Sequence, residues 1–264
     1  LTVPVYGAKA LTVSSVQMAQ APDVSQNIRK LCAMAEGMDA ATDIFLLPEL
    51  WTGMCGAGEA ASALEAVCRI CRDRGVYAVA GTVPWPSRDR PANRAWVVDD
   101  AGTPCAFYDK AHLFSPGGED KRFAAGDKPL IFSLRGIDCA VLVSYDIRFP
   151  EYARCAGLAG GLVFFIPSAW PREERGAWGT LLCAAAASSQ AYVVGCNAAS
   201  GGLMHEAGFG GSVAVSPQGD ITGMIGEGEG ILTARLEIGE VFKCRKQLPL
   251  ERDRRAGLYG MLFA

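Results

Sequence analysis

The sequence predicts an α/β fold, because apolar strand-like segments alternate with amphipathic helix-like segments along most of the 264 residues. A second observation is an internal similarity. "DIFLLPELW" and "LVFFIPSAW" each contain a proline, Pro48 and Pro167, and each precedes a helical stretch and then "YAVAG" or "YVVGC". Two α/β halves packed sheet on sheet would produce this pattern. Chance similarity explains it equally well, so it serves only to favour one layered domain, residues 1–264, over two.

The expected elements follow from periodicity and from boundary residues. Helices show apolar residues at a 3.6-residue period, and Asp23 or Ser25 suits the N-cap of the first helix. Strands are apolar or alternating runs bounded by turn signals such as Gly102. The expected strands are 10–19, 43–50, 76–84, 93–100, 104–114, 130–136, 139–143, 161–167, 192–198, 210–217, 221–226 and 230–236. The expected helices are 23–38, about 59–74, 144–157 and 175–190, and a polar tail closes the chain.

Composition excludes several classes of protein. With 50% hydrophobic and 20% charged residues and a net charge of -3, the chain has no basic stripe for nucleic acid and nothing typical of disorder. The longest apolar runs, such as residues 161–167, are far shorter than the ~20 residues that span a bilayer. The N-terminus lacks the basic and apolar regions of a signal peptide. We therefore expect a cytoplasmic protein with a small-molecule partner and no membrane association.

The ten cysteines are scattered through apolar segments, so reduced thiols are a better interpretation than disulfides. The only Cys-x-x-Cys pair, Cys68 and Cys71, lies in a helical pattern without a second pair, which favours helix packing over zinc or redox chemistry. No P-loop occurs, and the glycine clusters have the wrong spacing for dinucleotide binding. The sequence therefore indicates no metal and no cofactor.

Four residues that carry chemistry follow expected strands, where open α/β sheets place their sites. They are Glu49, Lys110, Glu119 in a glycine-rich loop, and Ser144 at a strand-to-helix corner. For each alone, a side chain facing water is the simpler interpretation, but four together are more informative. A Ser-His-Asp mechanism is disfavoured, because no Gly-x-Ser-x-Gly elbow occurs and only two histidines, at 112 and 205, are present.

Three segments resemble, in order and separation, the signatures of the nitrilase or carbon-nitrogen hydrolase superfamily: "LLPELW", "YDKAHLF" and "SYDIRFPE". The resemblance covers nearly the whole chain, from "VSSVQMA" to "DRRAGLYG". It implies a four-layer αββα sandwich that hydrolyses a non-peptide C-N bond without a metal. "FYDKAHLFSPGGEDKRFAAGD" and "AWPREERGAWGTLL" look most like the ω-amidase branch, which hydrolyses the terminal amide of short dicarboxylic acid monoamides such as 2-oxoglutaramate.

The resemblance also implies a role for each residue. Glu49 would take the nucleophile's proton, pass it to the leaving ammonia and then activate water. Lys110 and the backbone N–H of Tyr145 would stabilise the oxyanion, and Glu119 would orient substrate and nucleophile. Placing Lys110 between two carboxylates keeps it charged and separates the pKa values of the carboxylates.

The family's nucleophile is a cysteine, and its position is occupied here by Ser144. A thiol in water has a pKa of about 8.5, whereas a serine hydroxyl is far harder for a carboxylate to ionise. We therefore expect this chain to bind substrate and to turn it over very slowly or not at all. Deliberate replacement of the cysteine is the favoured explanation, because the three charged residues remain. A natural pseudoenzyme and a genuine serine amidase are the alternatives.

Side chains near the signatures are candidates for substrate binding. Tyr145, Trp170, Phe114 and Arg148 are the substrate-binding candidates, and Trp51 could wall the same pocket, although core packing explains aromatic residues equally well. An ω-amide substrate also needs a cation for its distal carboxylate, and the sequence does not decide among Arg122, Arg172 and Arg175.

Two alternatives to an ω-amidase remain open. One is another branch of the superfamily, namely a deaminated-glutathione amidase or an N-carbamoyl amide hydrolase. The other is a catalytically dead ligand-binding protein. The resemblance further implies a homodimer or higher homo-oligomer, with the helix after Ser144 and the C-terminal tail as contact surfaces.

Overall fold

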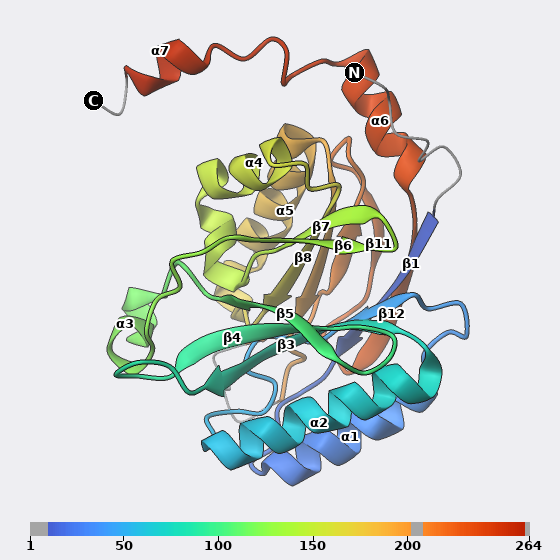
Figure 1. The fold of residues 1–264 in the computed structure, drawn as a ribbon, viewed down its shortest axis with the longest axis vertical. Helices are drawn as coiled ribbons and strands as arrows, with labels where there is room; N and C mark the ends of the chain where they lie inside the picture. The colour runs from blue at the N-terminus through green and yellow to red at the C-terminus, as the bar shows by residue number, and fades with distance from the viewer. Residues whose placement is uncertain (1–9, 202–207, 262–264) are drawn as a thin grey trace.

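Two six-stranded mixed sheets pack face to face in the computed structural model, which describes residues 10–201 and 208–261 (Figure 1). One pair of helices covers the outer face of each sheet, so the chain forms four layers in the order α, β, β, α. The expected αββα sandwich is thereby confirmed. Within the described residues no helix is both long and apolar enough to cross a membrane.

The first sheet has the strand order β12-β1-β2-β3-β4-β5. Its three strands β1 to β3 are parallel, β12 and β4 pair antiparallel with the outer two of these, and β5 pairs antiparallel with β4. The bounds are β1 Ala10–Gln17, β2 Ile44–Leu46, β3 Tyr77–Trp85, β4 Ala92–Val98, β5 Pro104–Asp109 and β12 Gly230–Glu237.

The second sheet has the strand order β11-β10-β9-β8-β7-β6 and repeats the pattern of the first. Strands β7 to β9 are parallel, and β6, β10 and β11 continue the sheet antiparallel. The bounds are β6 Leu130–Leu134, β7 Ile137–Val141, β8 Val163–Ser168, β9 Tyr192–Asn197, β10 Val213–Val215 and β11 Ile221–Met224. The strands β2 and β8, which carry the two similar sequence segments, therefore occupy equivalent places in the two sheets.

The helices that cover the sheets connect their parallel strands. On the first sheet these are α1 (Val24–Glu36), which the side chain of Asp23 caps by accepting from the Ser25 N–H at 2.7 Å, and α2 (Ala57–Arg74). On the second sheet they are α4 (Pro150–Leu158) and α5 (Arg175–Ser189). Cys71 is buried on α2, as helix packing of the Cys-x-x-Cys pair requires.

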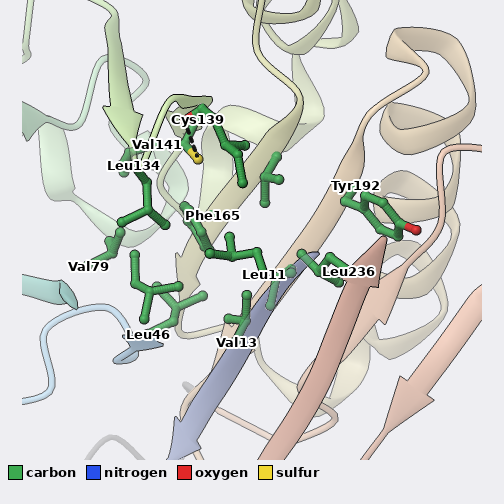
Figure 2. Packing of buried hydrophobic residues seen from close by; sticks show 14 of the residues in the cluster. Leu11, Val13, Leu46, Val79, Leu134, Cys139, Val141, Phe165, Tyr192 and Leu236 are labelled. Atoms are coloured by element: carbon green, nitrogen blue, oxygen red, sulfur yellow. Dashed lines mark hydrogen bonds between the residues drawn. The ribbon is translucent and has the colours of Figure 1, made fainter. Parts of the chain in front are cut away.

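The hydrophobic core is layered like the fold. The inner layer lies between the sheets, where Leu11 and Val13 of β1 meet Phe165 of β8 and Val141 of β7 (Figure 2). Because side chains alternate along a strand, the next apolar residue of β1, Val16, points to the other face and packs with α1 and α2. A third cluster joins α4 and α5 to the outer face of the second sheet.

The structure corrects three of the expected boundaries. The expected polar tail is helical, with α6 at Ile238–Gln247 and α7 at Ala256–Gly260. The buried residues of α6 are Ile238, Val241 and Cys244, which recur every three residues between charged side chains. The strand expected over residues 104–114 ends at Asp109. The strand expected over residues 43–50 ends at Leu46, although Leu47 and Pro48 still make backbone hydrogen bonds with β3.

All ten cysteines are free. The sequence places them in core segments, and this is wrong for Cys105 and Cys155, which are exposed.

Candidate active site

The ends of β2, β5 and β7 bring the predicted charged residues together in the interior. The Lys110 ammonium nitrogen lies 2.7 Å from Glu49 Oε1 and 2.8 Å from Glu119 Oε2. All three side chains are buried, and Ser144 is buried with them. The Ser144 hydroxyl lies near enough to the Glu49 carboxylate to act on it, in the direction that lowers the pKa of Glu49. Four positions that are up to 95 residues apart in the sequence therefore form one cluster.

The segment after β2 holds Glu49 between the two sheets. Its backbone N–H donates to the carbonyl of Ser168, at the end of β8, at 3.2 Å. The next residue, Leu50, has a left-handed φ of 47°, and its N–H donates to the Thr82 hydroxyl on β3 at 2.8 Å. These two contacts fix the backbone on both sides of the carboxylate.

A tight loop brings Glu119 to Lys110. Lys110 follows β5 directly, and the chain then passes through a 3₁₀ turn at Ser115–Gly117 into the short helix α3, Glu119–Arg122. Glu119 Oε2 accepts from the Phe114 N–H at 2.7 Å as well as from Lys110. The carboxylate thus has a backbone donor and a cationic donor, and it cannot leave Lys110 without breaking both bonds.

Ser144 begins a 3₁₀ turn, Ser144–Arg148, and has a φ of 50°. The left-handed region is uncommon for a residue with a side chain and costs free energy, so the surrounding structure must hold it there. The holding group is Asp146, whose Oδ2 accepts from the Val143 N–H at 2.7 Å. The result is a sharp corner that carries the Ser144 side chain out of β7 and toward Glu49.

Asp146 also ties this corner to the lysine loop. Its carboxylate is buried and accepts from the Tyr108 hydroxyl at 2.8 Å and from the His112 N–H at 3.0 Å, and it lies 2.7 Å from His112 Nδ1. Burial and the neighbouring carboxylate raise the pKa of Tyr108 far above its usual range, so its hydroxyl remains a donor. Because Tyr108 and His112 flank Lys110, a single carboxylate sets the position of Ser144 relative to the ammonium group.

The surroundings of Glu49 and Lys110 shift the pKa of each group. Burial raises the pKa of Glu49, Lys110 acts against this, and the nearby Glu119 charge adds to it. Burial alone would lower the pKa of Lys110, but the two carboxylates outweigh it and the pKa is raised, which keeps the ammonium charged. The cluster therefore holds a fixed cation beside a carboxyl group with increased proton affinity, an arrangement that suits proton transfer next to a developing negative charge.

The substrate-binding candidates lie around the same corner. Phe114 is partly exposed and makes an edge contact with Tyr145 at 5.0 Å between ring centroids. Trp170 follows β8 and is buried, and the Arg148 guanidinium lies 4.7 Å from its ring centroid while pairing with Glu174.

Trp51 lies elsewhere, in the outer core under α1 and α2, where its indole N–H donates to the Ala80 carbonyl. The three arginines considered for a substrate carboxylate have partners within the chain. Arg172 and Arg175 pair with Glu227, and Arg122 donates to the carbonyl of Gly117. His205 lies outside the described residues.

The sequence reasoning missed two buried polar residues of this region. Asp146 lies inside the quoted segment "SYDIRFPE", so its place two residues after Ser144 was an available signal. Asn93 begins the apolar run of β4, and nothing in the sequence relates it to Glu49, although its side chain donates to Glu49 Oε1 at 2.8 Å. Among residues 10–201 and 208–261, no group of three or more His, Cys, Asp or Glu side chains is arranged to hold a metal ion.

Comparison with known proteins agrees with this geometry. The family model for carbon-nitrogen hydrolases matches residues 12–246. A 2-oxoglutaramate amidase of Bacillus subtilis strain 168 is 32% identical over 244 residues, which cover 89% of this chain and 93% of the relative.

Solved structures share the fold. A Saccharomyces cerevisiae protein of branch 10 of the nitrilase superfamily gives a TM-score of 0.85 at 23% identity and covers 96% of this chain and 100% of its own. An amidase from Nesterenkonia sp. gives a TM-score of 0.83 at 26% identity, with 97% of each chain covered, and a mutant of that amidase carries acrylamide added at its active-site cysteine. The match to the family model over most of the length, together with this shared fold, shows that the chain belongs to the carbon-nitrogen hydrolase family of the nitrilase superfamily.

Proposed function

We propose that this chain is an amidase of the ω-amidase type, which hydrolyses the terminal amide of a small carboxylic acid amide. The observation that carries the proposal is the buried Lys110, held at 2.7 and 2.8 Å between Glu49 and Glu119 beneath the corner at position 144. The name of the Bacillus subtilis relative supports the substrate class.

In the proposed reaction, a nucleophile at position 144 attacks the amide carbon while Glu49 takes its proton. The negative charge moves to the amide oxygen, where Lys110 and the backbone N–H of Tyr145 stabilise it. The C-N bond then breaks, and Glu49 returns the proton to the leaving ammonia. Glu49 next activates a water molecule that attacks the acyl group and releases the acid. Glu119 holds Lys110 in place and orients the substrate.

Ser144 limits this reaction in the chain as it stands. Burial raises the pKa of Glu49, which makes it a stronger base, but the pKa of a serine hydroxyl lies far above that of a thiol. The related Nesterenkonia amidase reacts with acrylamide at a cysteine. We therefore keep replacement of a cysteine as the favoured explanation of Ser144, with a natural pseudoenzyme and a serine amidase as alternatives.

The substrate test uses the Ser144→Cys variant and measures ammonia release from succinamate, 2-oxoglutaramate, an N-carbamoyl amino acid and a nitrile. We expect the two ω-amides to be hydrolysed fastest. Preference for the N-carbamoyl compound would assign the chain to another branch of the superfamily. Release of ammonia from none of the four would contradict the ω-amidase proposal, and absence of any acylated protein would favour the ligand-binding alternative.

We also propose that the chain works as a homodimer in the cytoplasm. The C-terminal segment with α7 extends away from the two sheets (Figure 1), and it exposes Leu258 and Met261. Exposed apolar side chains on an extended arm suit burial against a second copy. The free state of all ten cysteines suits a reducing compartment. Light scattering that gives the 27.9 kDa mass of one chain would contradict the dimer.

A further inference from the structure

Asn93 contacts both partners of the central ion pair. It lies at the start of β4 and is completely buried. Its side-chain NH₂ group donates to Glu49 Oε1 at 2.8 Å, and its backbone carbonyl accepts from the Lys110 N–H at 3.0 Å. One residue of β4 therefore fixes the carboxylate directly and the lysine through its backbone.

The two oxygens of the Glu49 carboxylate are consequently different. Oε1 accepts from Lys110 Nζ at 2.7 Å and from Asn93 Nδ2 at 2.8 Å. Neither of these donors bonds to Oε2. Donors that point at one oxygen concentrate the negative charge there and leave no room for a proton on it. A proton taken from the nucleophile is therefore directed to Oε2.

The amide is oriented by this carboxylate. Asn93 Oδ1 is buried and has no hydrogen-bond partner in the described part of the chain, so no other bond decides which way the amide faces. Turning the amide over would point its carbonyl at the carboxylate. A buried carbonyl without a donor costs stability, and an apolar side chain of the same shape would avoid that cost. The contact with Glu49 is the compensating interaction that the structure shows.

We propose that Asn93 is a positioning residue that keeps Glu49 ionised in the interior and makes Oε2 its basic oxygen. The inference rests on the proposed role of Glu49 as the base for a nucleophile at position 144. Burial raises the proton affinity of Glu49. A donor on Oε1 opposes this, since a hydrogen bond to the charged form favours that form.

The test measures the pH dependence of two rates in the Ser144→Cys chain. The first is alkylation of the introduced thiol by iodoacetamide, located by peptide mass spectrometry to separate it from the other cysteines. The second is kcat/KM for ammonia release from succinamate. Both need Glu49 ionised, so the acid limb of each profile follows the proton affinity of Glu49. The alkylation rate does not depend on the chain being an amidase.

Adding Asn93→Leu removes the donor while keeping the shape of the side chain. We expect the acid limb to move upward by about one pH unit. Asn93→Asp places a third carboxylate beside Glu49 and should move it further. Asn93→Ser leaves room for a water that can donate, so it should give a smaller shift, and it serves as the readout if the other variants fail to show a cooperative melting transition.

The matched control is Asn27→Leu. Asn27 is equally buried, but its amide bonds to backbone groups of Ala21 and Thr52 and not to Glu49. We expect this variant to lose stability and keep the acid limb unchanged.

The outcomes separate the two proposals. A shifted alkylation profile without ammonia release supports the inference and contradicts the amidase. Ammonia release with an acid limb that is unchanged in every folded Asn93 variant overturns the inference and leaves the amidase standing. A folded Ser144→Cys chain that shows neither alkylation of the introduced thiol between about pH 5 and 9 nor ammonia release overturns both, because the base would then have no effect on position 144.

Discussion

At the scale of single residues, Glu49, the base of the proposed reaction, has a cost in stability. Its carboxylate is buried and its pKa is raised, chiefly by burial. A group whose pKa is higher in the folded state than its ordinary 4.5 stabilises the fold while protonated. That contribution is lost as the pH rises from about 4.5 through the folded-state value. The ionised form needed for proton transfer is thus the less stable one.

Glu49→Gln tests this relation. We expect the variant to melt at a higher temperature than the parent at pH 7, and the advantage to disappear near pH 4, where the parent carboxyl is neutral. In the Ser144→Cys background the same change should lower the rate of ammonia release by at least about a hundredfold, since general acid–base catalysis contributes that much or more. Melting curves at the two pH values check the first part. The control for the substitution itself is the exposed Glu65→Gln, which leaves the buried cluster untouched.

Ser144 stores backbone strain at the point where the reaction is proposed to occur. Its φ of 50° lies in the region that glycine adopts without steric cost. Ser144→Gly should therefore raise the free energy of unfolding by about 0.5–1 kcal/mol. Ser189→Gly, in the last turn of α5, should lower it, because glycine has low helix propensity. Urea denaturation measures both, and a destabilised Ser144→Gly would contradict the strain.

At the scale of elements, the 3₁₀ turn after β7 depends on Asp146. The carboxylate accepts from Val143, Tyr108 and the His112 backbone, and an amide in its place would present its NH₂ group to one of these donors. Asp146→Asn should therefore destabilise the chain by about 2 kcal/mol, the cost of an unsatisfied buried donor. In the Ser144→Cys background we also expect a lower kcat, because the corner moves relative to Lys110. Chemical denaturation and steady-state kinetics check the two effects, and unchanged values for both would contradict the positioning role of Asp146.

Most helices and strands are predictable, because the sequence patterns that identify them lie within each segment. Periodicity and Asp23 identify α1, and the apolar run around Phe165 identifies β8. The segment 238–247 resembles a polar tail because its four charged residues obscure the regular spacing of Ile238, Val241 and Cys244. Only the folded structure, in which α6 packs on the rest of the chain, shows that these three side chains are buried.

The candidate site is predictable only in part. Glu49, Lys110 and Ser144 follow strands and lie in signature segments, and Glu119 lies in the glycine-rich loop just after one of those segments, so the sequence points to all four. Asn93 contacts Glu49, which is 44 positions away, and Asp146 contacts Tyr108, which is 38 positions away. Such pairs form only when the chain folds. Burial and hydrogen bonding are properties of the folded chain, and no local pattern reports them.

At the scale of the whole molecule, the site belongs to the interface between two similar halves. Each sheet has three parallel central strands with antiparallel strands on both sides, and the similar segments at Pro48 and Pro167 end equivalent strands, β2 and β8. Glu49 follows β2 in one half, and its N–H bonds to Ser168 of β8 in the other. Lys110 and Ser144 likewise come from different sheets. The cluster exists only because the halves pack face to face.

The central claim is that the residues between the two sheets form an amidase site that lacks only a thiol nucleophile at position 144. The most direct measurement compares ammonia release from succinamate by the parent chain and by Ser144→Cys at the same pH and enzyme concentration. The account predicts a rate at least about a hundredfold higher for Ser144→Cys, because a thiol can give its proton to Glu49 and a hydroxyl cannot do so readily. Equal rates, or no release from the folded Ser144→Cys variant, would contradict it.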